Sequence, residues 1–210
     1  MTILIEAAVE SLEAALAAAE GGAHRLELCT DFAHGGTTPD LRLLRSCRSK
    51  IPIPIFVLVR PRAGHFVYTD AEHRTMLEQI RHAKDAGAHG IVTGSLNDDR
   101  MRELIAAARP LPVTFHRAFD VFPDRPEALE RLIHLGVDRV LTSGGAPTAP
   151  EGAAQIVELV IQARGRIEIL PGGGINADNV ARLVRDTGVR EVHFSVKDVE
   201  KVRRVVRSLR

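Results

Sequence analysis

The chain has 210 residues, 26% of them charged and 45% hydrophobic, which is enough to bury one core without a second domain. Its 28 basic and 27 acidic side chains give a net charge of +1, which argues against nucleic acid or an anionic membrane as a partner. The longest apolar stretch, Ile51 to Val59, contains two prolines and is too short to span a membrane. With two cysteines and no recognisable signal peptide, we expect residues 1–210 to form one cytoplasmic domain. The expected partner is a small molecule, a metal ion or a second copy of the chain.

Short β-branched or aliphatic runs alternate with longer segments of helical periodicity along the whole chain. This alternation is typical of an α/β protein with repeated βα units and a parallel sheet. In chain order, the predicted strands are Ile3 to Glu6, Arg25 to Leu28, Ile53 to Val59, Gly90 to Thr93, Val113 to His116, Arg139 to Thr142, Arg166 to Leu170, and Glu191 to Phe194.

A glycine recurs three or four residues before the core of every second strand. The repeated junctions are Gly22-Ala23-His24, Gly87-Ala88-His89, Gly136-Val137-Asp138 and Gly188-Val189-Arg190. Such a glycine is typical of a helix that ends in a left-handed residue before the chain re-enters the sheet. The junctions divide the chain into four two-strand quarters, which favours a single closed (β/α)8 barrel of the TIM type over an open sheet.

Polar residues end many of the predicted strands. Because side chains alternate between barrel interior and helix layer, strand parity predicts an inward set at one mouth, consisting of Glu6, Glu27, Arg60, His116, Thr142 and His193. Arg62, Arg117 and Asp120 are expected on the rim. Any one carboxylate and arginine of this set could simply neutralise each other inside the barrel, without a ligand. Buried ion pairs rarely improve stability over apolar packing, so a ligand better explains the whole cluster. The predicted catalytic residues are Glu6, Glu27, Arg60, His116 and His193.

Two glycine-containing segments follow the sixth and seventh predicted strands. Pro171-Gly172-Gly173-Gly174-Ile175-Asn176 opens a helix, where free backbone amides and the helix dipole favour an anion. Thr142-Ser143-Gly144-Gly145 offers similar donors nearby. We therefore expect an anion near Gly172, Gly173 and Gly174 and near Thr142 and Ser143.

The reaction classes can be narrowed by what the predicted strands lack. None contains a lysine for a Schiff base, and no Gly-x-Ser-x-Gly elbow is present. Glu6, Glu27, His116 and His193 could hold a divalent ion such as manganese, zinc or iron. A lyase or isomerase acting on a small anionic metabolite, with or without phosphate or a metal, is one function class that these residues allow.

Several motifs together resemble the CutC family, named as copper homeostasis proteins. They are Arg25-Leu26-Glu27-Leu28-Cys29, Gly35-Gly36-Thr37-Thr38-Pro39, Val59-Arg60-Pro61-Arg62, Val113 to Asp120, Leu141-Thr142-Ser143-Gly144 and Pro171-Gly172-Gly173-Gly174-Ile175. The resemblance covers nearly the whole chain and implies a cytoplasmic TIM-type barrel that takes part in copper binding or trafficking. It also implies Cys29 as a copper ligand, with Cys47 as the other cysteine to consider. One departure is the short connection after Ser195.

Spacing argues against a copper site shared by the two cysteines. Cys29 ends its strand at the mouth, whereas Cys47 lies in the following antiparallel helix, roughly 12 Å down from the mouth at 1.5 Å per residue. Its neighbours Leu43 and Leu44 place it in the apolar layer between helix and sheet. We therefore predict that copper(I) would use Cys29 with a pocket histidine or with a second chain. We also expect a homodimer, because soluble oligomers are most often twofold.

Overall fold

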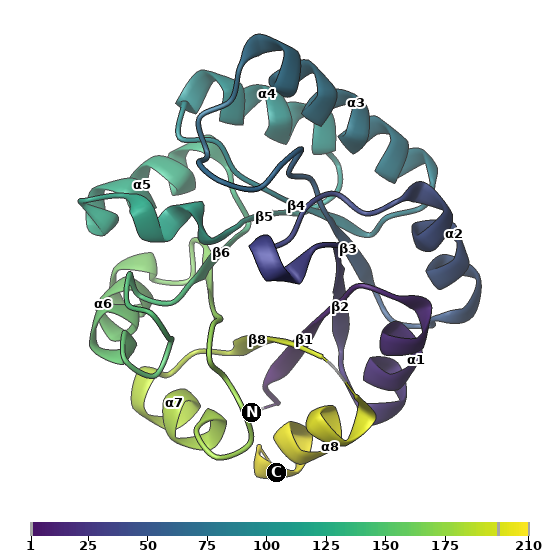
Figure 1. The fold of residues 1–210 in the computed structure, drawn as a ribbon. Helices are drawn as coiled ribbons and strands as arrows, with labels where there is room; N and C mark the ends of the chain where they lie inside the picture. The colour runs from purple at the N-terminus through teal and green to yellow at the C-terminus, as the bar shows by residue number, and fades with distance from the viewer. Residues whose placement is uncertain (1, 197, 210) are drawn as a thin grey trace.

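A ring of parallel strands forms the centre of the molecule (Figure 1). The computed structural model describes residues 2–196 and 198–209. In this part of the chain the strands are β1 (Leu4–Val9), β2 (Arg25–Leu28), β3 (Ile55–Leu58), β4 (Gly90–Thr93), β5 (Val113–Phe115), β6 (Arg139–Thr142), β7 (Glu168–Pro171) and β8 (Glu191–Ser195). They pair in the order β7-β6-β5-β4-β3-β2-β1-β8, and a parallel bridge between Gly172 and His193 joins the two ends. The predicted (β/α)8 barrel is confirmed.

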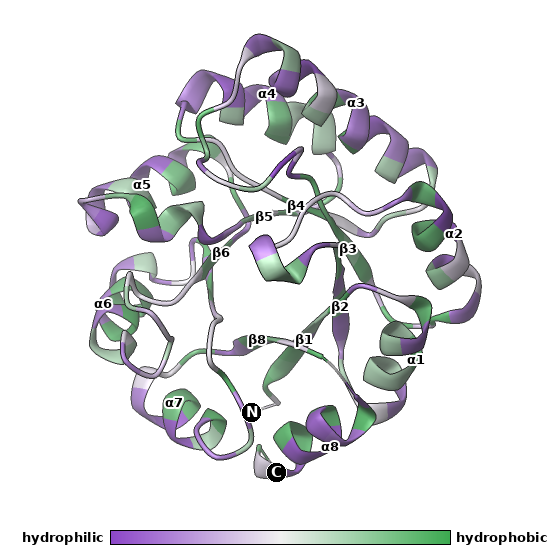
Figure 2. Ribbon diagram, viewed as in Figure 1, coloured by the Kyte–Doolittle hydropathy of each residue, from purple (hydrophilic) through white to green (hydrophobic). Residues whose placement is uncertain are grey.

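Helices surround this ring. They are α1 (Leu12–Gly21), α2 (Leu41–Lys50), α3 (Asp70–Asp85), α4 (Asp98–Ala108), α5 (Arg125–Leu135), α6 (Ala153–Ala163), α7 (Val180–Thr187) and α8 (Val199–Ser208), with 3-10 helices η1 (Phe32–His34) and η2 (Arg117–Val121). Figure 2 shows hydrophobic residues mainly where the helices face the strands, and hydrophilic residues mainly outside. Among the described residues, no helix is long and apolar enough to cross a membrane.

Alternate strand residues divide the core into an outer layer and an interior. Ile5, Leu26 and Val57 belong to the large apolar cluster between the sheet and the helices. Phe56 and Leu58 belong instead to a small cluster inside the ring, together with Cys29 and Val92. The polar side chains of β1, β2 and β8 share this interior with the small cluster, as the alternation predicted.

The predicted orientation of β6 was wrong. Thr114 points inward and contacts Arg139 on the neighbouring strand, with Arg139 Nη1 3.4 Å from Thr114 Oγ1. The register aligns Thr114 with Arg139, and residues aligned in a sheet share a face. Arg139 and Leu141 therefore face the interior, whereas Val140 lies in the outer layer and Thr142 is turned away from the pocket. The prediction had placed the polar residue Thr142 inward, whereas the register with β5 places Arg139 and Leu141 there.

The bounds of β1, β3 and β7 also differ from the prediction by two residues or more at one end, and those of β5 and β8 differ by one residue. β1 continues through Val9, so Glu6 lies in the middle of its strand and Ala8 takes the next inward position. β3 begins only at Ile55, after Pro54, because proline cannot donate a ladder hydrogen bond. The prediction that Glu6 ends its strand was wrong, and this places Glu6 one layer below the barrel mouth.

Three of the four repeated glycine junctions share a side-chain hydrogen bond at the opposite end of the barrel. His24 Nδ1 accepts from the Ile5 N–H at 3.0 Å, and His89 Nδ1 accepts from the Ile55 N–H at 2.9 Å. In the third junction, Asp138 Oδ2 accepts from the Val113 N–H at 2.7 Å. The third residue of each of these junctions therefore fixes the start of a neighbouring strand, which gives the repeat a stabilising role.

Candidate functional site

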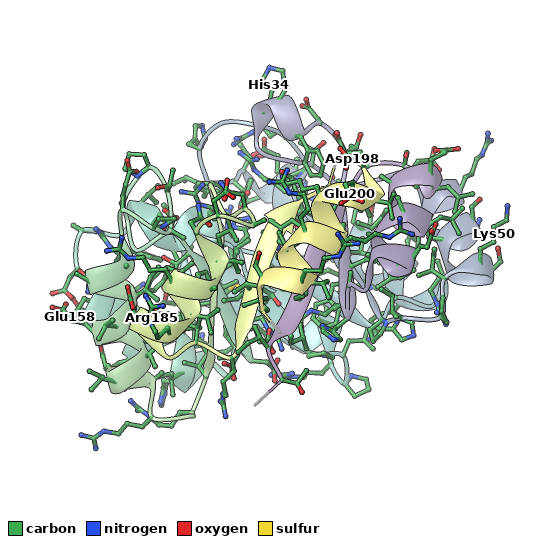
Figure 3. The ribbon with its side chains drawn as sticks, turned by 90° about the horizontal axis from the view of Figure 1, so that it is seen from below. His34, Lys50, Glu158, Arg185, Asp198 and Glu200 are labelled. Atoms are coloured by element: carbon green, nitrogen blue, oxygen red, sulfur yellow. The ribbon has the colours of Figure 1, made fainter. Side chains whose placement is uncertain are left out.

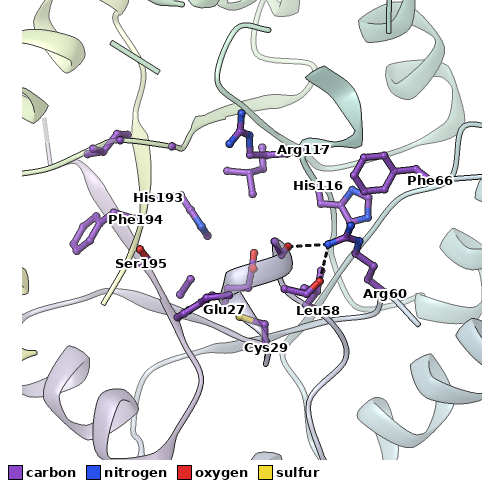
Figure 4. Close-up of a pocket in the computed structure, with 18 of the residues that line it drawn as sticks. Glu27, Cys29, Leu58, Arg60, Phe66, His116, Arg117, His193, Phe194 and Ser195 are labelled. Atoms are coloured by element: carbon purple, nitrogen blue, oxygen red, sulfur yellow. Dashed lines mark hydrogen bonds between the residues drawn. The ribbon is translucent and has the colours of Figure 1, made fainter. Parts of the chain in front are cut away.

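A pocket of about 360 Å³ opens at the carboxyl ends of the strands (Figure 4). The predicted residues that line it are Glu27, Cys29, Arg60, His116, Arg117, Gly173, Gly174 and His193. The predicted residues that do not line it are Glu6, Arg62, Asp120, Thr142, Ser143 and Gly172. The structure thus brings four of the five predicted catalytic side chains to one cavity and places Glu6 beneath it.

The η1 segment forms part of the pocket wall. Seen from the side, η1 projects from one end of the barrel and His34 points away from it (Figure 3). The Arg60 guanidinium holds this segment, because its Nη1 donates to the carbonyl oxygens of Gly35 and Gly36 at 3.0 and 2.8 Å. Its Nη2 donates to the Gly64 carbonyl at 3.0 Å. Arg60 therefore fastens two loops over the pocket.

A buried ion network forms the floor below the pocket. Arg25 pairs with Glu6 through Nε and with Glu191 through Nη2, and Arg139 pairs with Glu191 through two nitrogens. Burial alone would raise the pKa of Glu6, but Arg25 and the hydrogen bond from His193 lower it to about 2. Glu6 is therefore ionised, and its carboxylate fixes the position of His193.

Glu27 and His193 stand next to each other above this floor. His193 Nδ1 lies 2.8 Å from Glu6 Oε1, and one ligand atom from each of Glu6, Glu27 and His193 lies within 4.8 Å of the others. Burial raises the pKa of Glu27 to about 7. Burial lowers the pKa of His193, but Glu27 and Glu6 raise it further, so the net change is upward. Glu27 Oε2 is buried and has no hydrogen-bond partner in the described part of the chain.

This trio can be compared with the requirements of a metal site. Two carboxylates and an imidazole suit manganese, zinc or iron. However, Glu6 already pairs with Arg25 through one oxygen and with His193 through the other. A base oriented by a second group beside an acid of near-neutral pKa is the usual arrangement for proton transfer. Both oxygens of Glu6 are thus engaged by the protein, whereas Glu27 and His193 both line the pocket.

His116 lies on another side of the same pocket. Its Nδ1 accepts from the Ala118 N–H at 3.2 Å, and the Phe66 ring centroid is 5.0 Å away. Burial and the charge of Arg60 lower the pKa of His116 to about 3, against a smaller opposite effect of its own backbone. His116 is therefore neutral, and its buried Nε2 has no partner among the described residues.

The loop after β6 is filled by a carboxylate of the protein itself. Asp120 Oδ1 accepts from the Thr142 hydroxyl and from the Gly145 N–H at 3.2 Å. The Ser143 N–H lies 3.1 Å from both Asp120 oxygens. Arg117 Nε donates to Asp120 Oδ2 at 2.8 Å, and its Nη2 donates to the Ser143 hydroxyl at 2.6 Å. The donors that the sequence offered to an anion at Thr142 and Ser143 are thus used internally.

The loop after β7 is different. Gly172 N–H donates to the Thr142 carbonyl at 2.9 Å, which ties the two loops together. Within residues 2–196 and 198–209, the N–H groups of Gly173, Gly174 and Ile175 have no acceptor, and all three residues line the pocket. A Cβ on Gly173 would lie 3.2 Å from Arg117 Nη1, so this cation is next to the open amides. These groups together can bind a small anion.

The two cysteines lie on opposite sides of the barrel wall. Cys29 belongs to the interior cluster, and its Sγ lies 3.8 Å from the Val9 carbonyl. Cys47 is fully buried in the layer between α2 and the sheet, as the helix geometry predicted. Burial, together with Glu27, raises the pKa of the Cys29 thiol. Burial raises the pKa of Cys47 to about 11. A copper site shared by both thiols does not fit this arrangement.

Sequence analysis missed several residues that shape the site. Arg25 and Arg139 in the floor share the face of Glu27 and Thr114, so strand register contains the signal, but arginines at strand starts are usually solvent-exposed. Lys201 lines the pocket from α8 and donates to the Ser195 carbonyl at 2.6 Å, and no motif pointed to it. The predicted rim residue Arg62 pairs instead with Glu72 near the start of α3.

Comparison with known proteins identifies the family. The family model described as the CutC family matches residues 3–198. This chain belongs to the CutC family. It is 46% identical over 200 residues to the copper homeostasis protein cutC homolog of Mus musculus, covering 92% of this chain and 74% of the relative. The crystal structure of CutC from Streptococcus agalactiae superposes with a TM-score of 0.88 at 34% identity, covering 92% of this chain and 98% of that one.

A more distant likeness concerns the fold alone. The N-(5'-phosphoribosyl)anthranilate isomerase of Pyrococcus furiosus gives a TM-score of 0.63 at 18% identity, covering 99% of this chain and 98% of the isomerase. The CutC resemblance predicted from the motifs is confirmed, and the relatives carry the name of copper homeostasis proteins.

Proposed function

We propose that this CutC-family barrel binds a small anionic metabolite in its pocket and exchanges protons with it, as a lyase or isomerase does. The observation that carries this proposal is the buried Glu27 carboxyl, which has an oxygen without a partner and a pKa raised to about 7 by burial. A buried carboxylate oxygen without a partner in the described part of the chain costs stability, and a ligand best explains its presence.

Each group has a defined task in this proposal. Glu27 takes or gives a proton, because its pKa lies near the working pH. His193 is held through Nδ1 by Glu6, so its other nitrogen can assist as a second acid or base. The open amides of Gly173 and Gly174, with Arg117 beside them, bind the anionic end.

Calorimetry with inorganic phosphate tests this function. Titrations near pH 7 in two buffers of different ionisation enthalpy measure the protons taken up on binding. We expect uptake in the wild type, because a bound anion favours protonated Glu27, and less uptake in Glu27→Gln. Glu158→Gln, on the exposed face of α6, is the matched control and should behave as the wild type. No heat and no thermal stabilisation with phosphate, sulfate or acetate at millimolar concentration would contradict the proposal.

Copper binding is a second candidate, favoured by the names of the relatives and by the place of Cys29 in the pocket wall. Copper(I) prefers thiolate ligands, and Cys47 lies on the far side of the sheet. Copper(I) would therefore bind Cys29 with a pocket histidine or with a second chain. Binding releases the thiol proton, which the raised pKa of Cys29 makes costly at neutral pH.

Anaerobic copper(I) titration distinguishes the two cysteines. Cys29→Ser should abolish binding, and Cys47→Ser should leave it unchanged. Equal loss in both variants, with the fold intact, would show that the cysteines act together despite their separation.

The setting of the protein also belongs to the proposal. We expect it in the cytoplasm, as a homodimer, with a small molecule or metal ion as ligand and with no nucleic acid or membrane partner. Light scattering should give twice the chain mass of 22.9 kDa, and the single chain mass would reject the dimer. Cell fractionation tests the compartment.

A further inference from the structure

The hydrogen bonding of His116 shows which of its ring nitrogens carries the proton. Its Nδ1 receives the Ala118 N–H at 3.2 Å, so this nitrogen acts as an acceptor and carries no proton. A neutral imidazole holds one proton, which must then be on Nε2. The ring orientation is fixed as well, because the ring packs between Gly94 and Phe66. The approach to Gly94 is so close that an added Cβ there would lie 2.7 Å from the ring. His116 therefore presents Nε2–H in one fixed direction.

This donor has no acceptor within the part of the chain that the structure describes. Nε2 is buried and without a partner, and His116 is 5% exposed. A buried donor without an acceptor costs free energy comparable to a lost hydrogen bond, so the molecule gains when a ligand supplies the acceptor. The positive charge of Arg60 favours an oxygen that carries or develops negative charge. Its guanidinium lies 5.0 Å from the centroid of Phe66, the ring that also contacts His116.

Glu27 stands in the same pocket, on β2, whereas His116 follows β5. In Figure 4 the two side chains lie on different sides of the opening. A ligand of metabolite size in a cavity of about 360 Å³ can meet both at once. Each has one buried polar atom without a partner among the described residues, an acceptor oxygen on Glu27 and a donor nitrogen on His116. A base and a neutral donor facing one ligand is the arrangement used to remove a proton next to a carbonyl.

We propose that His116 is the electrophile of this site, and that the substrate is a small anionic α-hydroxycarbonyl compound whose carbonyl oxygen accepts a hydrogen bond from His116 Nε2. This inference rests on the proposed function and names its substrate class. The anionic end lies at the Gly173 and Gly174 amides, the carbonyl oxygen at His116, and the carbon that bears the hydroxyl next to Glu27.

The reaction balances without a further reactant. The Glu27 carboxylate removes the proton from the hydroxyl-bearing carbon, and the C–H electron pair becomes the C=C bond of an enediolate. The carbonyl π pair moves onto its oxygen, where the His116 N–H stabilises the charge. The hydroxyl proton passes to that oxygen, and Glu27 returns its proton to the former carbonyl carbon. The carbonyl group has then moved to the neighbouring carbon.

The first test measures the tautomer and needs no ligand. Long-range 1H–15N NMR of the free protein at pH 7 should show His116 protonated at Nε2 and unprotonated at Nδ1. A proton on Nδ1, or on both nitrogens, would overturn the inference while leaving the anion pocket and Glu27 untouched.

The second test compares two probes by calorimetry. Phosphoglycolohydroxamate mimics an enediolate, and ethyl phosphate offers the same anionic end without the carbonyl oxygen. The hydroxamate should bind wild type tighter by about tenfold or more, since it satisfies a buried donor. His116→Leu should lose this difference but still bind ethyl phosphate, which also reports an intact pocket. His116→Gln should keep part of it, and His134→Gln, on the exposed face of α5, should keep all of it.

The outcomes separate the inference from the function on which it depends. If ethyl phosphate binds and the hydroxamate binds no tighter, the role of His116 is wrong and the anion pocket stands. If neither compound binds, the anion pocket itself is wrong and the inference fails with it. Equal loss of both probes in His116→Leu and His116→Gln, with the fold preserved, would show that His116 only supports the wall.

Discussion

The loops after β6 and β7 both contain consecutive glycines, but a carboxylate of the protein fills only the β6 loop. In the β6 loop, Asp120 occupies the donors of Thr142, Ser143 and Gly145. In the β7 loop, the amides of Gly173 and Gly174 lack an acceptor among the described residues, and both residues line the pocket. The two carboxylates at this mouth differ in the same way. Asp120 accepts hydrogen bonds from several donors, whereas Glu27 has an oxygen without a partner among the described residues. Paired groups at this mouth stabilise the fold, and unpaired groups are available to a ligand.

We expect the largest change in stability on replacing Asp120, whose carboxylate is hydrogen-bonded within the β6 loop. Asp120→Asn removes the charge that accepts hydrogen bonds from Thr142, Ser143, Gly145 and Arg117. We expect it to lower the free energy of unfolding by about 2 to 4 kcal/mol. Urea denaturation measures this. Asp99→Asn is the control, because Asp99 forms an exposed pair with Arg102 on α4 and its replacement should change stability little. If Asp120→Asn is as stable as wild type, the β6 loop does not depend on its internal anion.

Replacing Glu27 is expected to raise the free energy of unfolding rather than lower it. Its pKa is about 7 in the folded protein against 4.5 for a free glutamate, so the folded state binds more protons between these values and stability falls as the pH rises through this window. Glu27→Gln removes this loss, and we expect it to gain on the order of 1 to 3 kcal/mol over wild type at pH 8, with little difference at pH 4.5. Denaturation at both pH values measures the change. A variant less stable than wild type at pH 8 would show that Glu27 is a structural partner.

Two glycines, Gly174 in the loop after β7 and Gly188 at the end of α7, test the open loop. Both Gly174 and Gly188 have φ of +71°, but an added Cβ at Gly174 would lie 2.7 Å from Thr148, whereas nothing lies within 4 Å at Gly188. Either alanine variant should lose about 1 kcal/mol through backbone strain. Only Gly174→Ala should also displace the β7 loop and weaken phosphate binding. Calorimetry with equal phosphate affinity in the two variants would place the anion elsewhere.

The sequence predicted features that depend on neighbouring residues in the chain better than features that depend on contacts between distant segments. Strand periodicity and the glycine junctions are local, and they predicted the barrel and the inward positions of Glu27, His116 and His193. The orientation of β6 depends on its register with β5, so Arg139 was missed and Thr142 was assigned to the wrong face. The occupied state of the β6 loop depends on Asp120, which lies in η2, and glycine composition carries no sign of it.

Arg117 connects the two loops and gives the last and smallest effect on stability. It donates to Asp120 and Ser143 on the filled side, and its Nη1 lies near Gly173 on the open side. Because its side chain is 42% exposed, solvent screens its ion pair, and Arg117→Gln should cost about 0.5 kcal/mol or less. Phosphate affinity should fall about tenfold, because the cation beside the open amides is lost, and the loss should shrink at high salt. Arg185→Gln, an exposed arginine on α7, is the control. If Arg117→Gln destabilises the fold strongly and leaves phosphate affinity unchanged, Arg117 belongs to the filled loop alone.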